Sequence, residues 1–202
     1  MVGAPGALLV VISGPSGVGK DAVIEALRRQ PELSDTDYVV TFTTRARRNG
    51  ETDGVSYHFV DPARFAAMRA AGELLEASEV HGHWYGTPRD QVVDGLTRGR
   101  DVILKIDVQG ARTVRRRVRQ AVLIFIVPPS PEDLDARLRG RATESADELA
   151  VRQRDALREL ARQGDYDHVV VNETGQVDRT AERIARIIEA EHRAHPGRRV
   201  SV

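Results

Sequence analysis

The sequence contains no cysteine. This absence excludes disulfide bonds, thiolate metal sites and thiol nucleophiles together. The chain also has no net charge at pH 7, because 30 lysine and arginine residues balance 30 aspartate and glutamate residues. A balanced chain creates no overall field that attracts nucleic acid or an anionic membrane, so we expect neither as a partner.

Long apolar runs are absent as well. The first apolar stretch, residues 7–12, is too short to span a bilayer and has no basic flank, so it favours a buried strand. The start at Met1-Val2 does not fit an N-myristoylation signal. We therefore expect a soluble protein of the cytoplasm, and 202 residues are enough for one α/β domain with a proper core.

A glycine-rich loop follows this first apolar stretch. It consists of Gly14, Pro15, Ser16, Gly17, Val18, Gly19 and Lys20. Glycines at these spacings let the backbone turn tightly, so that consecutive N–H groups point inward and form a nest for an anion. Lys20 opens the next helix and can reach the β- and γ-phosphates of a nucleotide. The order of strand, loop and helix predicts a nucleoside triphosphate site.

The rest of the chain alternates apolar and amphipathic segments. Continuous apolar runs predict core strands over residues 7–13, 38–42, 101–107, 121–127 and 167–171. The patterns between them predict helices over residues 21–29, 62–71, 89–97, 131–139, 146–162 and 177–192. Residues 56–60 and 74–80 predict strands of an insertion with antiparallel character, over about residues 42–90. We expect residues 196–202 to fray.

The predicted strand over residues 101–107 ends in an acid, Asp107. In nucleotide-binding α/β folds the carboxyl ends of the strands converge on the phosphate site, so we expect Asp107 to face Mg²⁺ or an arginine beside it. An insertion after the second strand is a natural place for an acceptor site.

With these motifs, residues from about 8 to 191 resemble the guanylate kinases, which move the γ-phosphoryl group of ATP onto GMP. The most specific match consists of Thr43, Thr44, Arg45, Arg48, Gly50, Glu51, Gly54, Tyr57 and Phe59. Further matches are Glu76, residues 82–87, residues 106–110, the lid-like Arg137, Leu138, Gly140, Arg141, Thr143 and Glu144, and residues 170–172.

The resemblance implies an α/β, three-layer P-loop kinase fold with a parallel core sheet, a small mixed α+β GMP-binding insertion and a helical lid. It implies a single domain over residues 1–202. The parts of that domain would be a core over about 5–41, 91–139 and 163–195, a GMP-binding insertion over about 42–90, and a lid over about 140–162.

On the acceptor side, the resemblance implies that Thr41, Glu76 and Thr87 contact the guanine base. The residues implied to hold the rest of GMP are Arg45, Arg48, Tyr57, Tyr85 and Asp107. A carboxylate such as Glu76 can accept both the N1–H and the N2–H of guanine, which adenine does not offer. Arginines three residues apart present planar forks that match a phosphate group.

On the donor side, the resemblance implies that ATP is bound by the glycine-rich loop together with Asp21 and Asn172. Mg²⁺ is the expected cofactor, with Asp21 and Asp107 as candidate ligands. The residues implied to act in catalysis are Lys20, Arg45, Arg141 and Arg152. No protein nucleophile is required, because phosphoryl transfer needs positioning and charge neutralisation.

Four residues depart from the family's pattern: Arg47 replaces a common proline, Ala142 replaces a lid glycine, and the other two are Asp21 and Lys105. Asp21 stands where the loop normally ends in Ser or Thr, and Lys105 stands where the family strand commonly has Asp or Glu. The Asp21 carboxylate can bind Mg²⁺, yet it brings negative charge towards anionic phosphates. We hypothesise that Lys105 pairs with Asp21 beside the metal site. Alternatively, Lys105 contacts the acceptor or the donor phosphate directly.

Two other functions remain open at this point. Kinases resembling the ribose 1,5-bisphosphate phosphokinases also carry Gly-Lys-Asp at the end of this loop, so Asp21 favours them, whereas the acceptor motif and Glu76 favour GMP. A guanylate-kinase-like module without catalysis would bind phosphorylated partners through Arg45, Arg48 and Tyr57. Lys20 in an intact loop argues against such a module, because binding alone needs no triphosphate site.

Overall fold

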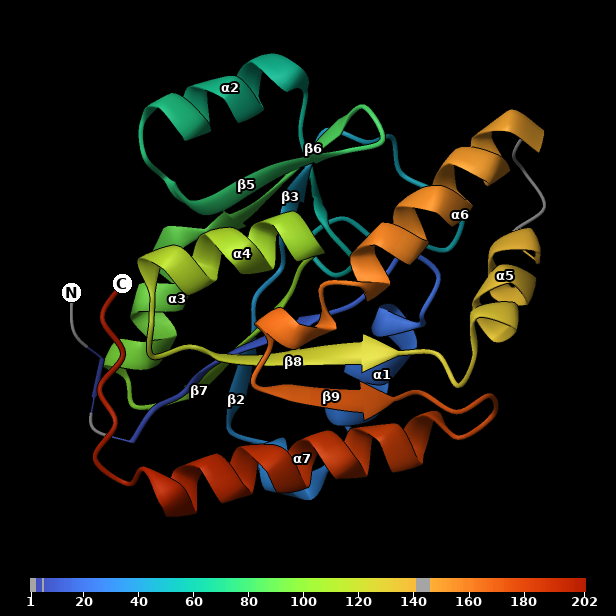
Figure 1. Ribbon diagram of the computed structural model, residues 1–202. Coiled ribbons are helices and arrows are strands. Elements are labelled where there is room, and N and C mark those ends of the chain that lie inside the picture. The colour runs from blue at the N-terminus through green and yellow to red at the C-terminus, as the bar shows by residue number, and fades with distance from the viewer. Residues whose placement is uncertain (1–2, 5, 141–145) are drawn as a thin grey trace.

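The centre of the computed structural model, which describes residues 3–4, 6–140 and 146–202, is a five-stranded sheet (Figure 1). Its strands are β1 (Leu9–Ser13), β2 (Thr36–Tyr38), β7 (Asp101–Lys105), β8 (Val122–Val127) and β9 (His168–Val171). They lie in the order β2-β7-β1-β8-β9, and each neighbouring pair is parallel. The predicted α/β fold with a parallel core sheet is confirmed, and the carboxyl ends of the strands share one edge.

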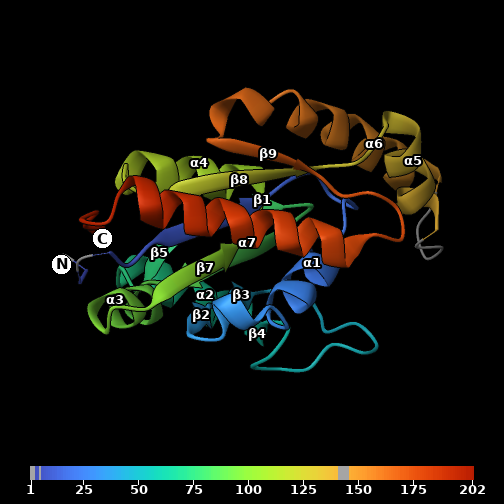
Figure 2. The same ribbon diagram turned by 90° about the horizontal axis from the view of Figure 1, so that it is seen from below.

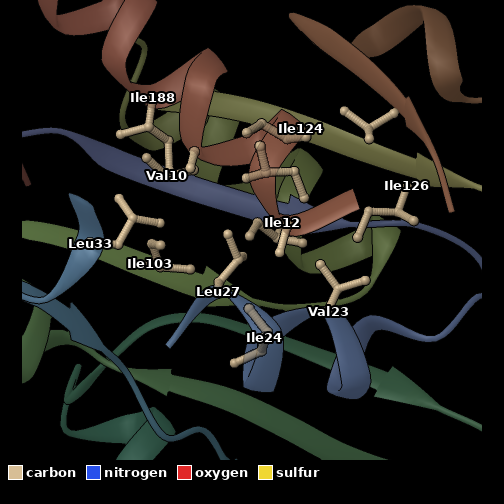
Figure 3. Close-up of a cluster of buried hydrophobic side chains, with 14 of the residues drawn as sticks. Val10, Ile12, Val23, Ile24, Leu27, Leu33, Ile103, Ile124, Ile126 and Ile188 are labelled. Carbon is tan, nitrogen blue, oxygen red and sulfur yellow. The ribbon is translucent and has the colours of Figure 1, made fainter. Parts of the chain in front are cut away.

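Helices cover both faces of this sheet. On one face α1 (Lys20–Leu27) lies beside α7 (Val177–Ala194), as Figure 2 shows, and on the other face lie α3 (Arg89–Thr97) and α4 (Val108–Arg117). Val10 and Ile12 of β1 pack in the cluster with α1 and α7 (Figure 3), whereas Leu9 and Val11 pack in the cluster with α3 and α4. Because side chains of a strand alternate between faces, this doubly covered strand is apolar along nearly its whole length.

A second sheet of four strands stands beside the core (Figure 1). Its strands are β3 (Phe42–Thr43), β4 (His58–Phe59), β5 (Leu74–Val80) and β6 (His83–Pro88), and α2 (Pro62–Ala70) packs on it through Phe65 and Met68. β6 is antiparallel to β3 and β5, but β4 is parallel to β3. The prediction of an antiparallel strand over residues 56–60 is therefore wrong in direction, because alternation shows a strand's faces but not its neighbour's orientation.

The prediction of one strand over residues 38–42 is also wrong. β2 ends at Tyr38 in the core sheet, and β3 begins at Phe42 in the second sheet. Between them, the N–H of Val39 donates to Ile103 O at 3.1 Å, whereas Thr41 O accepts from the N–H of His58 at 2.9 Å. The β-branched run serves two sheets, and the chain passes from one to the other at Thr41.

Asp107 explains why the predicted strand over residues 101–107 is too long. Its side chain accepts hydrogen bonds from the N–H groups of Gln109, at 2.7 Å, and Gly110, at 3.1 Å. These bonds cap the N-terminus of α4, so the strand ends at Lys105. Neither α4 nor β6 is among the predicted elements.

Two helices stand beside the carboxyl edge of the core sheet (Figure 1). They are α5 (Pro131–Arg139) and α6 (Ala146–Leu160), which pack together through Leu134, Leu138 and Ala156. Short 3₁₀ turns span Pro31–Leu33 and Gln163–Asp165. Within the described ranges, none of the helices is both long and apolar enough to cross a membrane.

The C-terminal segment packs on the core, so the prediction that residues 196–202 fray is wrong. Val200 is fully buried in the cluster that contains Ala7 and Leu96. Its carbonyl accepts a hydrogen bond from the N–H of Gly3 at 2.7 Å, and Arg198 O accepts from the N–H of Gly6 at 2.9 Å. One apolar side chain and two backbone hydrogen bonds hold this mainly polar segment in place.

Candidate active site

A cavity of about 650 Å³ lies where the glycine-rich loop after β1, the end of β7, the second sheet with its loops, and α6 meet. The predicted site residues that line it are Gly14, Ser16, Gly17, Gly19, Lys20, Asp21, Thr41, Arg45, Arg48, Tyr57, Glu76, Tyr85, Asp107 and Arg152. The fold thus brings most of the predicted residues, from segments far apart in the chain, to one place.

The start of the loop packs closely against the backbone of β8. Gly14 has a φ of 151°, and a Cβ there would lie 2.4 Å from Ile126 O, so no larger residue fits without a backbone shift. The ammonium of Lys20 curls back and donates to Gly14 O at 2.6 Å and to Pro15 O at 3.0 Å. Burial lowers the pKa of Lys20, and the nearby carboxylates of Glu159, Asp21 and Asp107 only partly offset it.

Helix α6 reaches the loop with two charged side chains. Arg152 Nη2 donates to Ser16 Oγ at 3.0 Å, and Ser16 N–H donates to Glu159 Oε2 at 3.0 Å. Burial raises the pKa of Glu159, although Lys20 and the Ser16 N–H favour its charged form. Sequence analysis missed Glu159; the available signal is its position seven residues after Arg152, on the same face of a helix.

Arg45 is the centre of a charged cluster on the second-sheet side. It is 8% exposed, and its guanidinium pairs with both carboxylate oxygens of Glu51, at 2.6 and 3.1 Å. Its Nε donates to Tyr85 Oη at 3.3 Å, and its charge lies 5.5 Å from the ring centroid of Tyr57. Partial burial opposes the charge on Glu51, but hydrogen bonds from Arg45 and Arg48 outweigh it and lower the pKa of Glu51. The positive charge is therefore already oriented.

Glu76 is a buried carboxyl group at the wall of the same cavity, 2% exposed. Oε1 accepts a hydrogen bond from the Thr87 hydroxyl at 2.7 Å, whereas Oε2 has no hydrogen-bond partner within the described part of the chain. A Cβ on Gly110 would lie 2.6 Å from Oε2, so the glycine leaves room for the carboxylate. Burial raises the pKa of Glu76 to about 8. Such a group is prepared to accept hydrogen bonds from a bound molecule.

Asp107 faces the cavity while it caps α4. Its second oxygen accepts a hydrogen bond from the Ser78 hydroxyl, which sequence analysis did not predict. In residues 3–4, 6–140 and 146–202, no three His, Asp or Glu side chains group as a metal site. Mg²⁺ commonly takes only one or two protein carboxylates, together with phosphate oxygens and water. Asp21 and Asp107 line the same cavity and fit that requirement.

The comparisons with known proteins agree with this geometry. Residues 7–191 match the sequence model of a family described as guanylate kinase. The chain belongs to the guanylate kinase family. The guanylate kinase of Streptococcus agalactiae is 46% identical over 185 residues, which cover 92% of this chain and 87% of that protein.

Two further relatives agree. The guanylate kinase of Mycobacterium bovis is 47% identical over 166 residues, 81% of this chain and 79% of its own. The crystal structure of guanylate kinase from Anaplasma phagocytophilum superposes with a TM-score of 0.76 at 34% identity, covering 95% of this chain and 88% of that one.

Two of the four departures from the guanylate kinase pattern, Asp21 and Lys105, lie side by side. Ala142 lies outside the described residues. Lys105 Nζ is 2.5 Å from Asp21 Oδ1, which confirms the predicted ion pair. Lys105 is 18% exposed and Asp21 71% exposed, and the ammonium also lies 4.6 Å from the ring centroid of Tyr57. Burial opposes the charge on Lys105, but Tyr57 and Asp21 outweigh it and raise the pKa of Lys105.

Four predicted residues of the described ranges lie outside the cavity lining: Pro15, Val18, Thr87 and Asn172. Thr87 is fully buried behind Glu76. Asn172 lies beneath the loop, where its amide donates to Val18 O at 2.8 Å and its carbonyl accepts from Thr180 at 3.0 Å. Pro15 belongs to the loop, and its carbonyl is held by Lys20. Arg141 lies outside the described residues.

Proposed function

We propose that this chain transfers the γ-phosphoryl group of ATP to GMP and gives ADP and GDP. The observation that carries the proposal is Glu76, whose Oε2 is buried and without a hydrogen-bond partner in the described ranges. Guanine presents two adjacent N–H donors to such a carboxylate, and adenine presents none in that place. Thr41, which is 4% exposed and lines the cavity, adds a hydroxyl for the same base.

The GMP phosphate lies beside Arg45, Arg48, Tyr57 and Tyr85 in this proposal. Arg45 is held by Glu51 and Tyr85, so little side-chain entropy is lost when a phosphate binds. The ring of Tyr57 packs edge-on against Tyr85 at 5.9 Å, which fixes both phenols at the cavity wall. A ribose 1,5-bisphosphate acceptor would leave the Glu76 carboxylate without donors, so this geometry favours GMP.

The ATP phosphates lie on the loop N–H groups and Lys20, and Arg152 adds positive charge from α6. Arg141, Asp21 and Asn172 belong to the same donor side by resemblance. When bound, Mg²⁺ neutralises charge on the β- and γ-phosphates, and Asp21 and Asp107 are the residues that would hold it. The protein contributes position and charge, with Lys20, Arg45, Arg141 and Arg152 as the catalytic residues.

Three parts of the chain divide this work. The core comprises about residues 5–41, 91–139 and 163–195, residues 42–90 bind GMP, and residues 140–162 act as a lid. The Asp155 carboxylate of α6 lies 4.0 Å from His81 in the turn between β5 and β6, a contact that supports closure across the cavity. We place the reaction in purine nucleotide metabolism and in the cytoplasm, where ATP is the common phosphoryl donor.

The test is ATP- and Mg²⁺-dependent transfer to GMP, measured beside AMP and ribose 1,5-bisphosphate as acceptors. We expect GDP to form from GMP, and we expect no transfer to AMP or to ribose 1,5-bisphosphate. Transfer to ribose 1,5-bisphosphate instead would support the sugar kinase alternative. GMP binding without transfer would support the binding module.

A further inference from the structure

Lys105 is one of only two lysines in the chain; the other 28 of its 30 basic residues are arginines. The second lysine is Lys20 of the loop, and both line the same cavity. Lysine carries a compact charge with three donors, whereas arginine carries a wide planar fork. All the other basic residues of the chain are arginines, so lysine, the compact cation, occurs only at these two positions.

The position of Lys105 follows from the core sheet. β7 lies beside β1, and Lys105 is in register with Ile12, just before the glycine-rich loop. The side chain therefore leaves the carboxyl edge next to the loop. It lies between Asp21, at the start of α1, and Tyr57, which belongs to the second-sheet side.

The contacts of Lys105 link it to the residues proposed for the GMP phosphate. Its ammonium donates to Asp21 and interacts with the Tyr57 hydroxyl and ring. The guanidinium of Arg45 lies over the same Tyr57 ring, at 5.5 Å. An ammonium has three donors, so it can hold Asp21 and Tyr57 and still donate to an oxygen in the cavity that it lines.

We propose that Lys105 is a further substrate-binding residue, which donates to the acceptor phosphate and is positioned by Asp21 and Tyr57. The inference rests on the proposed function, because the acceptor phosphate is that of GMP. Lys20 already donates to the loop, whereas Lys105 lies against the ring of Tyr57 that Arg45 also contacts, so we place Lys105 on the acceptor side. Asp21 then anchors Lys105 in addition to its proposed place beside Mg²⁺.

The experiment compares GMP with guanosine, which lacks the phosphate, by calorimetry on the full chain. Lys105→Met is expected to weaken GMP binding about ten- to hundredfold, the usual worth of a charge-assisted hydrogen bond, and to leave guanosine binding unchanged. If wild-type protein binds no GMP, the proposed function fails. If wild-type and Lys105→Met bind GMP equally, only this inference fails.

A double variant separates phosphate binding from simple neutralisation of Asp21. If Lys105 only neutralises Asp21, removing both charges in Asp21→Ser/Lys105→Met restores GMP affinity. We expect the double variant to stay as weak as Lys105→Met. Asp21→Ser alone is expected to weaken GMP binding less than Lys105→Met does, because Lys105 loses one anchor but keeps its charge and its contact with Tyr57. Recovery of GMP affinity in the double variant overturns the inference.

A spectroscopic measurement observes Lys105 itself. Incorporation of lysine labelled with ¹³C at Cε observes both lysines and leaves their three N–H donors intact, and Lys105→Arg assigns the Lys105 signal. We expect that signal to shift with GMP and not with guanosine. A shift with the nonhydrolysable ATP analogue AMP-PNP alone would place Lys105 on the donor phosphates and contradict the inference.

Discussion

The two sides of the cavity are built in different ways. The loop side is one continuous segment, residues 14–20, where glycine conformations turn backbone N–H groups towards an anion. The second-sheet side gathers side chains from separate segments, and these are already paired, as in Arg45 with Glu51 and Glu76 with Thr87. A backbone site depends on local sequence, whereas a side-chain site depends on charge, pairing and pH. The two sides are therefore expected to fail in different ways.

The largest expected effect is on the loop side. Lys20→Met removes the ammonium that lies over Gly14 and Pro15, and we expect kcat/KM for ATP to fall about 10³-fold, since this charge meets the transferring phosphoryl group. Steady-state kinetics give the loss. GMP affinity, measured by calorimetry, is the control and is expected to change little. An equal loss of GMP affinity would show that the two sides are not independent.

The next effect is on the second-sheet side. Glu76→Gln keeps the shape of the side chain but can place an NH₂ donor against the N–H donors of guanine, and we expect GMP affinity to fall about 10²-fold. Calorimetry with GMP measures the loss, and ATP affinity is the control. Unchanged GMP affinity would remove Glu76 from the base site and with it the main support for GMP as the acceptor.

A pH profile sharpens the same contrast, because Glu76 has a pKa of about 8 in the folded chain and an ordinary value of 4.5. The folded state therefore binds the Glu76 proton more tightly than the unfolded state does. The contribution of this proton to the free energy of unfolding is full below pH 4.5 and is lost as pH rises through 8. Guanine needs the carboxylate form, so GMP affinity is expected to rise about 25-fold between pH 6.5 and 8.5, in proportion to the ionised fraction of Glu76.

Two measurements check this profile. The midpoint of thermal unfolding is expected to fall with rising pH more steeply in wild type than in Glu76→Gln, and the affinity profile is expected to flatten in the variant. A wild-type GMP affinity that is flat over this range would mean that Glu76 binds as the neutral acid.

Sequence predicts the two sides unequally, for the same physical reason. The loop is predictable because its residues are adjacent in the chain, and most strands of the core sheet are short continuous runs of apolar residues. The crossing at Thr41 is not predictable by pattern, since a β-branched run does not reveal which sheet it joins. Glu159 and Ser78 come from elements whose place is set by tertiary packing, so their contacts with the loop and Asp107 appear only in three dimensions.

The smallest expected effect concerns Glu159, a side chain that binds a backbone N–H of the loop. Its carboxylate accepts the Ser16 N–H at 3.0 Å, a donor of the backbone nest that phosphate would use. Glu159→Gln removes the competing charge beside Lys20, so we expect KM for ATP to fall about three- to tenfold, with GMP affinity unchanged. Glu182→Gln, the same change at an exposed position of α7, is the matched control and is expected to leave KM for ATP unaltered. A rise in KM for Glu159→Gln would mean that the carboxylate positions the loop instead of competing for it, and the backbone side would then also depend on a side-chain pair.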